Sequence, residues 1–262
     1  MKTNVIVVAS VLAIAGIAFI VRKPARLNEV AVPQAPDVRP VTSEKPMDHV
    51  APNSPVADDE VFQRLRQLRE SGRKSDSRTL LPLLETQDRM IQIEVLATLH
   101  KIGDAETVPA IVRLSDTEDT LLLRGVISAL AGIGERTPVG SQGHLILQPL
   151  TRIFQREKNS QADDAEGNVF AVVKAIGSLR HPSAVEFLTE QLEVSTDDPV
   201  MQAAIVRALG RMNAQEAVPV LERLATSIRQ RPADISEHFK LAYEDLQRLT
   251  QSTLEKIARD NP

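Results

Sequence analysis

The chain has 262 residues, of which 42% are hydrophobic and 25% charged, a composition typical of globular proteins and not of fibrous or fully disordered ones. Only 3% of the residues are aromatic and none is cysteine, which disfavours β-sandwiches and barrels and excludes disulfides, thiolate metal sites and a cysteine nucleophile. With 31 basic and 35 acidic residues, the net charge of −4 lacks the basic excess of nucleic-acid-binding proteins. We therefore expect a helical protein without a nucleic-acid partner.

The N-terminal region carries a membrane-targeting segment. Residues 5–21 are seventeen uncharged, mostly apolar residues between Lys2 and Arg22, near the minimum length for crossing a bilayer. A cleavable signal peptide is the alternative, because Ala13 and Ala15 form a small-x-small cleavage site. Cleavage there would leave an apolar new N-terminus, so an uncleaved single-pass anchor is favoured over a signal for residues 1–23.

The orientation of this segment is ambiguous from charge alone. Basic residues are more numerous after the apolar run than before it, which favours a cytoplasmic domain. A short basic N-terminus followed by an apolar run is, however, how bacterial export signals usually begin. We expect a membrane-anchored protein with an extracytoplasmic, periplasmic domain; release into the periplasm after signal cleavage stays open.

Residues 24–57 form a proline-rich linker. Seven prolines fall between residues 22 and 55 without any apolar periodicity. Because proline interrupts both helices and strand ladders, this stretch is expected to be a disordered, semi-stiff spacer. The folded part of the chain is then expected to cover residues 58–262.

Internal repeats follow the linker. Val173 to Leu179 aligns with Val206 to Met212, and the glycines Gly177 and Gly210 lie 33 residues apart. Earlier copies begin at Thr98 and Ser128, and the copy at Ser128 is followed by a spacing of 46 residues, so this unit contains an insertion. In each unit, apolar residues at helical spacing predict two helices that bury their faces only by stacking on neighbouring units.

These repeated residues resemble the HEAT-repeat family, in particular the short bacterial units that also occur in phycobilisome lyase subunits. The stretches 98–111, 175–188 and 208–221 match a pattern close to A-L-G-x-I-G-D-x-x-A-V-P-x-L. The resemblance implies an all-α fold, an α-α superhelix (HEAT-like solenoid) of about five helix pairs plus a C-terminal capping helix. It implies little about activity.

The apolar periodicity sets the expected helices. The small residues at positions 125, 171 and 204 are expected to allow paired helices to pack closely. Gly210 and Asn213 are expected to form a turn between two helices. Phe239 and Leu241 are expected to belong to the apolar face of the last helix. The expected helices cover residues 58–71, 76–87, 89–102, 105–115, 118–134, 143–157, 165–179, 182–194, 199–211, 214–229 and 234–258.

A search for catalytic chemistry finds no motif that predicts an enzyme. The five histidines are scattered without metal-ligand spacing, and no cofactor, metal or small-molecule substrate is indicated. The acidic cluster at residues 163–168 is interpreted as helix capping, not as a cation site. The basic run from Arg64 to Arg78 is interpreted as the solvated outer face of the first repeat, not as a lipid or nucleic-acid site.

The surface of the solenoid remains as the candidate site. In solenoids resembling this one the second helix of each pair lines the concave side. Residues expected to bind a protein partner on that side are Arg113, Glu186, Glu190, Glu222 and Arg223. We therefore expect a membrane-tethered, non-catalytic scaffold that binds another protein; the alternative is an accessory subunit of a lyase-like or other enzyme whose chemistry lies in another chain.

Overall fold

A computed structural model describes residues 55–138, 143–230 and 237–260, all within the second of two compact units, which comprises residues 51–262. The predicted membrane segment at residues 5–21 and all but the end of the predicted linker lie outside these described residues. Within them, no helix is both long and apolar enough to cross a membrane. The first helix begins at Pro55, three residues before the predicted start of the folded region at residue 58.

The described residues form helices joined by short connections. The helices are α1 (Pro55–Ser71), η1 (Lys74–Glu85), α2 (Arg89–Ile102), α3 (Val108–Val112), α4 (Thr120–Arg136), α5 (Gly143–Lys158), α6 (Ala165–Ile176), α7 (Pro182–Val194), α8 (Pro199–Met212), η2 (Gln215–Ala217), α9 (Val218–Arg229) and α10 (Glu237–Asp260), with η marking 3-10 helices. The predicted α-helical repeat is confirmed.

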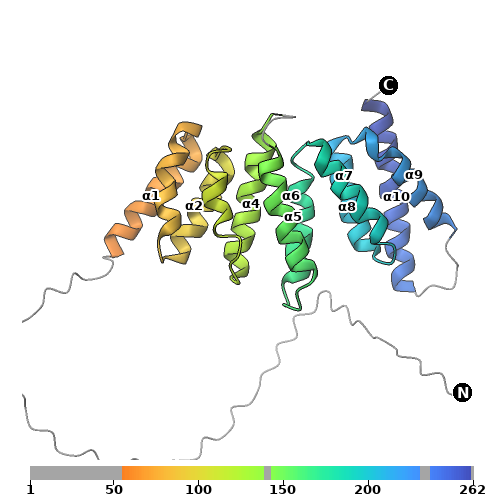
Figure 1. Ribbon diagram of the computed structural model, residues 1–262, viewed down its shortest axis with the longest axis horizontal. Coiled ribbons are helices and arrows are strands. Elements are labelled where there is room, and N and C mark those ends of the chain that lie inside the picture. The colour runs from red at the N-terminus through yellow and green to blue at the C-terminus, as the bar shows by residue number, and fades with distance from the viewer. Residues whose placement is uncertain (1–54, 139–142, 231–236, 261–262) are drawn as a thin grey trace, which may run out of the picture. The chain divides into compact units, whose positions relative to one another are not determined.

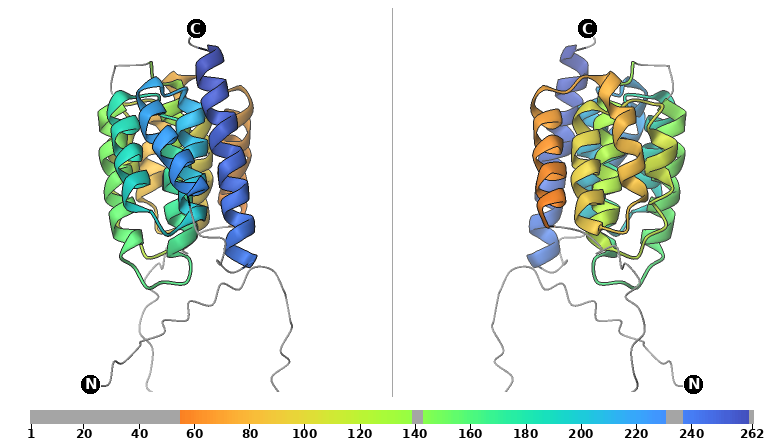
Figure 2. Two further views of the ribbon diagram at one scale, coloured as in Figure 1. Left: turned by 90° about the vertical axis from the view of Figure 1, so that its right-hand side faces the viewer. Right: turned by 90° about the vertical axis from the view of Figure 1, so that its left-hand side faces the viewer.

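The helices are arranged in two layers (Figures 1 and 2). In the first layer, α1, α2, α4, α6, α8 and α10 pack side by side in chain order. In the second layer, η1, α5, α7 and α9 each pack against the first-layer helix that follows in the chain. One core of buried Leu, Ile, Val and Ala side chains extends from Leu65 to Ile257 between the layers. The predicted capping helix, α10, thus occupies the place of a sixth first-layer helix.

Two elements outside the first layer, η1 and α3, differ from the expected α-helices. The stretch predicted as a helix over 76–87 is the 3-10 helix η1, which contains Pro82 and begins where Asp76 bonds the backbone N–H of Arg73. Pro82 cannot donate an α-helical hydrogen bond, and Thr79 donates its hydroxyl to the Asp76 carbonyl, so side chains compete with regular α geometry.

The helix predicted over 105–115 is shorter in the structure, because only Val108–Val112 is α-helical. The N–H groups of Leu114 and Ser115 bond to carbonyls three residues earlier, which is the pattern of a 3-10 turn.

Two expectations about single residues are wrong. Gly210 lies inside α8, and the turn is made by Asn213 alone, which has a left-handed backbone with φ of 55°. A Cβ atom at Gly210 would lie 3.0 Å from the Thr253 side chain, so glycine permits the close approach of α10. Phe239 and Leu241 are 43% and 63% exposed, because α10 is ten residues longer than α8 and its first turns extend past α8.

Aspartates begin most of the first-layer helices. Asp88, Asp119 and Asp198 precede α2, α4 and α8, and each accepts hydrogen bonds from two backbone N–H groups of the first turn at 2.8–3.1 Å. Asp164 precedes α6 but makes no such bond. The capping interpretation of the 163–168 cluster is therefore wrong for the Asp164 side chain, which instead lies 3.4 Å from Arg124 on α4.

Basic side chains connect first-layer helices at their C-terminal ends. Arg136 of α4 donates to the carbonyls of His100 and Gly103 at the end of α2, at 2.6 and 3.0 Å. Arg211 of α8 reaches Lys174 O of α6, and Lys256 of α10 reaches Gly210 O of α8. Each bond satisfies a carbonyl that has no partner within its own helix, and each fixes the register of two neighbouring helices.

Candidate protein-binding surface

The five residues predicted to bind a partner are all exposed. Arg223 of α9 forms an ion pair with Glu193 of α7, which the sequence analysis did not single out. Arg113, just after α3, lies 3.5 Å from Glu85 at the end of η1. The same kind of pair therefore recurs between successive second-layer elements. Surface pairs of this kind contribute little to stability.

The structure brings only some of these residues together. Glu186 and Glu190 lie on α7 beside Glu193, and Glu222 and Arg223 lie on the next second-layer helix, α9. Arg113 is separated from them by α5. Glu222 lines a groove of about 650 Å³ between α9 and α10, and Arg113 lines a notch of about 270 Å³ between η1 and α3.

A second surface was not predicted. The N-terminal ends of the first-layer helices lie at one edge of the array, together with the C-terminal ends of α5, α7 and α9 (Figure 1). Of the seven large apolar side chains that are exposed in the described residues, six lie at this edge and are 43–65% exposed. We call this surface the N-edge, defined by Met90, Leu121, Val194, Val200, Phe239 and Leu241.

Three of the N-edge side chains occupy equivalent positions in successive units. Met90, Leu121 and Val200 each stand two residues after the aspartate that begins their helix. In α6 the corresponding residue is Glu166. The sequence carries this signal as an apolar residue two positions after Asp88, Asp119 and Asp198, but helical periodicity identifies only the buried faces of helices.

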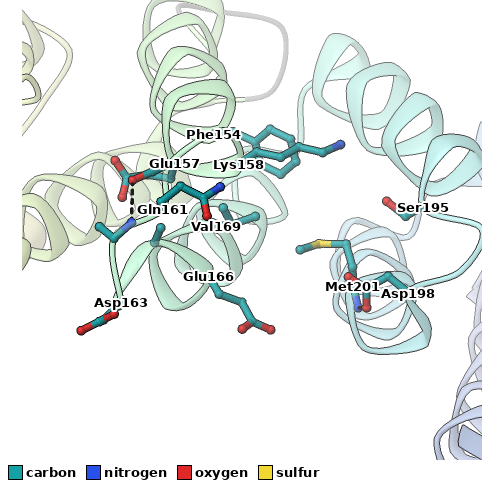
Figure 3. A pocket seen from close by; sticks show the side chains of 13 residues that line it. Phe154, Glu157, Lys158, Gln161, Asp163, Glu166, Val169, Ser195, Asp198 and Met201 are labelled. Carbon is teal, nitrogen blue, oxygen red and sulfur yellow. Dashed lines mark hydrogen bonds between the residues drawn. The ribbon is translucent and has the colours of Figure 1, made fainter. Parts of the chain in front are cut away.

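Two pockets open at the N-edge, one on each side of the start of α6. The first lies between α6 and α8, has a volume of about 410 Å³ and has Phe154, Val169 and Met201 as its buried apolar floor. Figure 3 shows the residues of α5 and α6 on one side and those around the start of α8 on the other. The polar residues labelled around this pocket are Glu157, Lys158, Gln161, Asp163, Glu166, Ser195 and Asp198.

The second pocket lies between α4 and α6 and has a volume of about 460 Å³. It shares Glu157, Ser160, Ala162 and Ala165 with the first pocket, so the two are neighbours. Asp116, Glu118 and Arg156 line its other side. Both volumes are in the range of ligand-binding pockets.

A buried polar network fixes the wall between the pockets. Glu157 is only 8% exposed and accepts hydrogen bonds from Asn168 and Arg156, each at 2.8 Å. Arg156 also donates to the Ser115 carbonyl at 2.6 Å, and Arg124 donates to Asn168 at 3.3 Å. Because a buried carboxylate is costly without partners, these bonds hold the end of α5 and the start of α6 in place.

The enlarged unit builds this site. The insertion seen as a 46-residue spacing lies in the unit that contains α5, a 16-residue helix, and the connection at residues 159–164 that leads to α6. Glu157, Lys158 and that connection line the pocket between α6 and α8. The unit that departs from the repeat is therefore the unit that forms a concave surface at the N-edge.

The pockets carry excess negative charge. In the described part of the chain, Glu118, Asp163, Glu166 and Asp198 form no ion pair, whereas Asp164 pairs with Arg124. No group of three or more His, Asp or Glu side chains in that part has the geometry to hold a metal ion.

The repeated pairing of helices in two layers defines an α-helical repeat protein, an α-solenoid. The family of HEAT repeats matches residues 160–232, which cover the end of the enlarged unit, α6 to α9 and the residues just after them. Over these residues the chain is similar to HEAT repeats, in agreement with the resemblance that its sequence pattern indicates. No curated protein is similar enough to be matched to this chain.

Three solved structures to which this chain is similar are engineered or designed proteins. An engineered protein from the Northeast Structural Genomics Consortium is 17% identical, with 80% of this chain and 94% of that chain covered and a TM-score of 0.45. A designed armadillo repeat protein in complex with the peptide (KR)4 is 16% identical, with 78% and 95% covered and a TM-score of 0.46. A second engineered protein from the same consortium is 20% identical, with 75% and 50% covered and a TM-score of 0.40.

Proposed function

We propose that this protein is a helical-repeat scaffold that binds another protein and performs no catalysis of its own. The observation that carries the proposal is the N-edge, along which six exposed apolar side chains lie and at which two pockets open between the helices that carry Leu121 and Val200. Exposed apolar side chains that cluster at one place mark interaction sites more often than scattered ones do. The repeat fold supports the proposal, since stacked helix pairs present an extended surface for binding.

We further propose that the scaffold is tethered to a membrane. The apolar residues 5–21 support a single-pass anchor, and the proline-rich linker would hold the folded array away from the bilayer. The folded domain is then extracytoplasmic, in the periplasm. A mass measurement of the mature protein tests this: retention of residues 5–21 supports the tether, whereas their loss supports release after signal cleavage.

The exposed face of α7 and α9 is a second proposed binding surface. Its residues are Glu186, Glu190, Glu222 and Arg223, and Arg113 belongs to the same layer further along the array. The groove beside Glu222 supports this surface. Its charges are mixed and partly paired, which favours the N-edge as the primary site.

An accessory subunit of an enzyme is the alternative function. The resemblance to units found in phycobilisome lyase subunits is the observation that favours it. Such a subunit brings one catalytic chain with it in stoichiometric amount, whereas a scaffold copurifies with a partner that has no catalytic centre.

Crosslinked affinity purification of the detergent-solubilised full-length protein tests the proposal. We expect one protein partner with the wild type and a loss of at least tenfold with the double variant Leu121→Ser, Val200→Ser. The matched comparison is the triple variant Glu190→Lys, Glu222→Lys, Arg223→Glu on α7 and α9. If no protein partner is recovered with the wild type, the proposed function is wrong; if only the triple variant loses the partner, the second surface is the binding site.

A further inference from the structure

We propose that the pocket between α6 and α8 binds the side chain of a lysine or arginine from an extended segment of the protein partner. This inference rests on the proposed function and specifies the chemistry of the partner. It starts from the composition of the pocket, which combines a buried apolar floor with a carboxylate rim.

The floor and the rim together select a long cationic side chain. Phe154, Val169 and Met201 are each at most 9% exposed and offer contact to an aliphatic stem. Asp163 and Glu166 line the same pocket from the α6 side, and Asp198 lines it from the start of α8 (Figure 3). Lysine and arginine bury their methylene groups on apolar surfaces while the charged group reaches acceptors, which matches this arrangement.

Asp163 and Glu166 are not used by the fold, whereas Asp198 caps the start of α8. Asp163 and Glu166 have no ion-pair partner in the described residues, and the neighbouring Asp164 is already paired with Arg124. Lys158, on the rim, donates to Gln191 of α7 at 3.2 Å and lies 5.5 Å from the Phe154 ring centroid, so other contacts hold its ammonium group. A second cation can therefore neutralise the free carboxylates without displacing a structural contact.

The N-edge residues beside the pocket predict how far apart the basic residue and an apolar residue lie in the partner segment. Packed helices lie about 8–10 Å apart and an extended chain advances about 3.3 Å per residue. Leu121 on α4 is one and a half helix spacings from the pocket, which corresponds to about four residues of an extended partner. We therefore expect an apolar residue about four positions from the basic one, on the side that runs toward α4.

A positional-scanning library of nine-residue peptides, applied to the full-length protein in detergent micelles, tests this inference. We expect one peptide position to show a strong preference for a basic residue. At that position the wild type should enrich peptides with Lys or Arg at least tenfold over peptides with any other residue. The double variant Asp163→Asn, Glu166→Gln should lose this preference at least tenfold while keeping the same thermal unfolding midpoint. The matched control is Glu190→Gln, Glu222→Gln, which removes the same charge from α7 and α9 and should leave the preference unchanged.

Three outcomes would overturn the inference: peptides enriched without a basic residue, equal enrichment by the double variant, or no enrichment of any peptide. None of these outcomes decides the proposed function, because recovery of a protein partner in the crosslinked purification tests that function separately.

Discussion

Gly167 and Gly177 lie at opposite ends of α6, and their surroundings predict opposite effects of the same substitution. A Cβ atom at Gly177 would lie 2.6 Å from the Cβ atom of Ala208 on α8, where both helices would have to move apart. At Gly167, inside the first turn of α6, the nearest contact is the Nη2 atom of Arg124 at 3.0 Å, the mobile end of a long side chain.

We predict that Gly177→Ala lowers the free energy of unfolding by about 1–3 kcal/mol through overpacking. Gly167→Ala should raise it by about 0.5 kcal/mol, because alanine favours the helix over glycine. Urea unfolding of both full-length variants measures the two changes. Equal effects at the two positions would show that α6 and α8 are not packed as closely as described.

Asp119 links stability to pH through its ionised carboxylate. Partial burial raises the pKa of Asp119, but the hydrogen bond and charge of Arg89 and the N–H groups of Leu122 and Leu121 outweigh it and hold the pKa below its usual 3.8. Since the unfolded chain binds the proton more tightly, the stabilisation is fully present above pH 3.8 and is lost as the pH falls through the folded-state pKa.

Asp119→Ala should therefore cost about 1 kcal/mol at neutral pH. The difference from wild type should shrink as the pH falls below 3.8, as measured by urea unfolding across that range. Asp164→Ala is the comparison, because Asp164 makes no capping bond and its exposed pair with Arg124 contributes less. A pH-independent loss at Asp119 would contradict the role given to the charge.

The sequence allowed some of these residue-level features to be predicted. Asn213 was expected in a turn, and asparagine tolerates the left-handed backbone that it adopts there. Arg180, with φ of 46°, carries no such signal. The different contacts of Gly210 and Gly167 depend on which helices are neighbours, which a linear pattern does not contain.

At the level of elements, the buried network around Glu157 decides how α5 meets α6. Asn168 is 2% exposed and donates to Glu157, so Asn168→Ala leaves a buried carboxylate with one of its two side-chain donors. We predict a loss of about 2–3 kcal/mol, because an unsatisfied charged group costs more than a neutral one. Denaturant unfolding of the full-length variant measures it.

Thr189→Ala on α7 provides the control for this substitution. Its hydroxyl bonds only to a carbonyl of its own helix, Val185 O, and the side chain is half-buried, so we expect a much smaller loss. A similar loss at both positions would mean that the network does not hold α5 and α6 together.

Helix existence was easier to predict than helix type. Long amphipathic segments such as α4 and α8 match the expected ranges within a few residues, because one apolar face at a 3.6-residue period has few alternatives. The helix type of η1 and the length of α3 did not match the prediction, since Pro82, Thr79 and Thr107 compete locally with α-helical bonding. The pocket between α6 and α8 was not predicted, because it requires the three-dimensional position of the insertion.

At the scale of the whole molecule, the regular repeat units and the enlarged unit that contains α5 contribute different features to the N-edge. The regular units place aspartates and apolar residues at the same edge of successive first-layer helices. The enlarged unit adds Glu157, Lys158 and the 159–164 connection at that edge, and so turns a regular edge into one with two adjacent pockets. The binding that we propose at the N-edge therefore depends on the stacked array, because no isolated helix pair forms these pockets.

Site-specific photocrosslinking of the full-length protein in its native cells tests this claim most directly. A photoreactive amino acid at Val200, on the N-edge, should crosslink to a protein partner, and the same residue at Arg152, on the exposed side of α5, should do so at least tenfold less. Crosslinks from Arg152 alone, or no protein crosslink from Val200, would contradict the account.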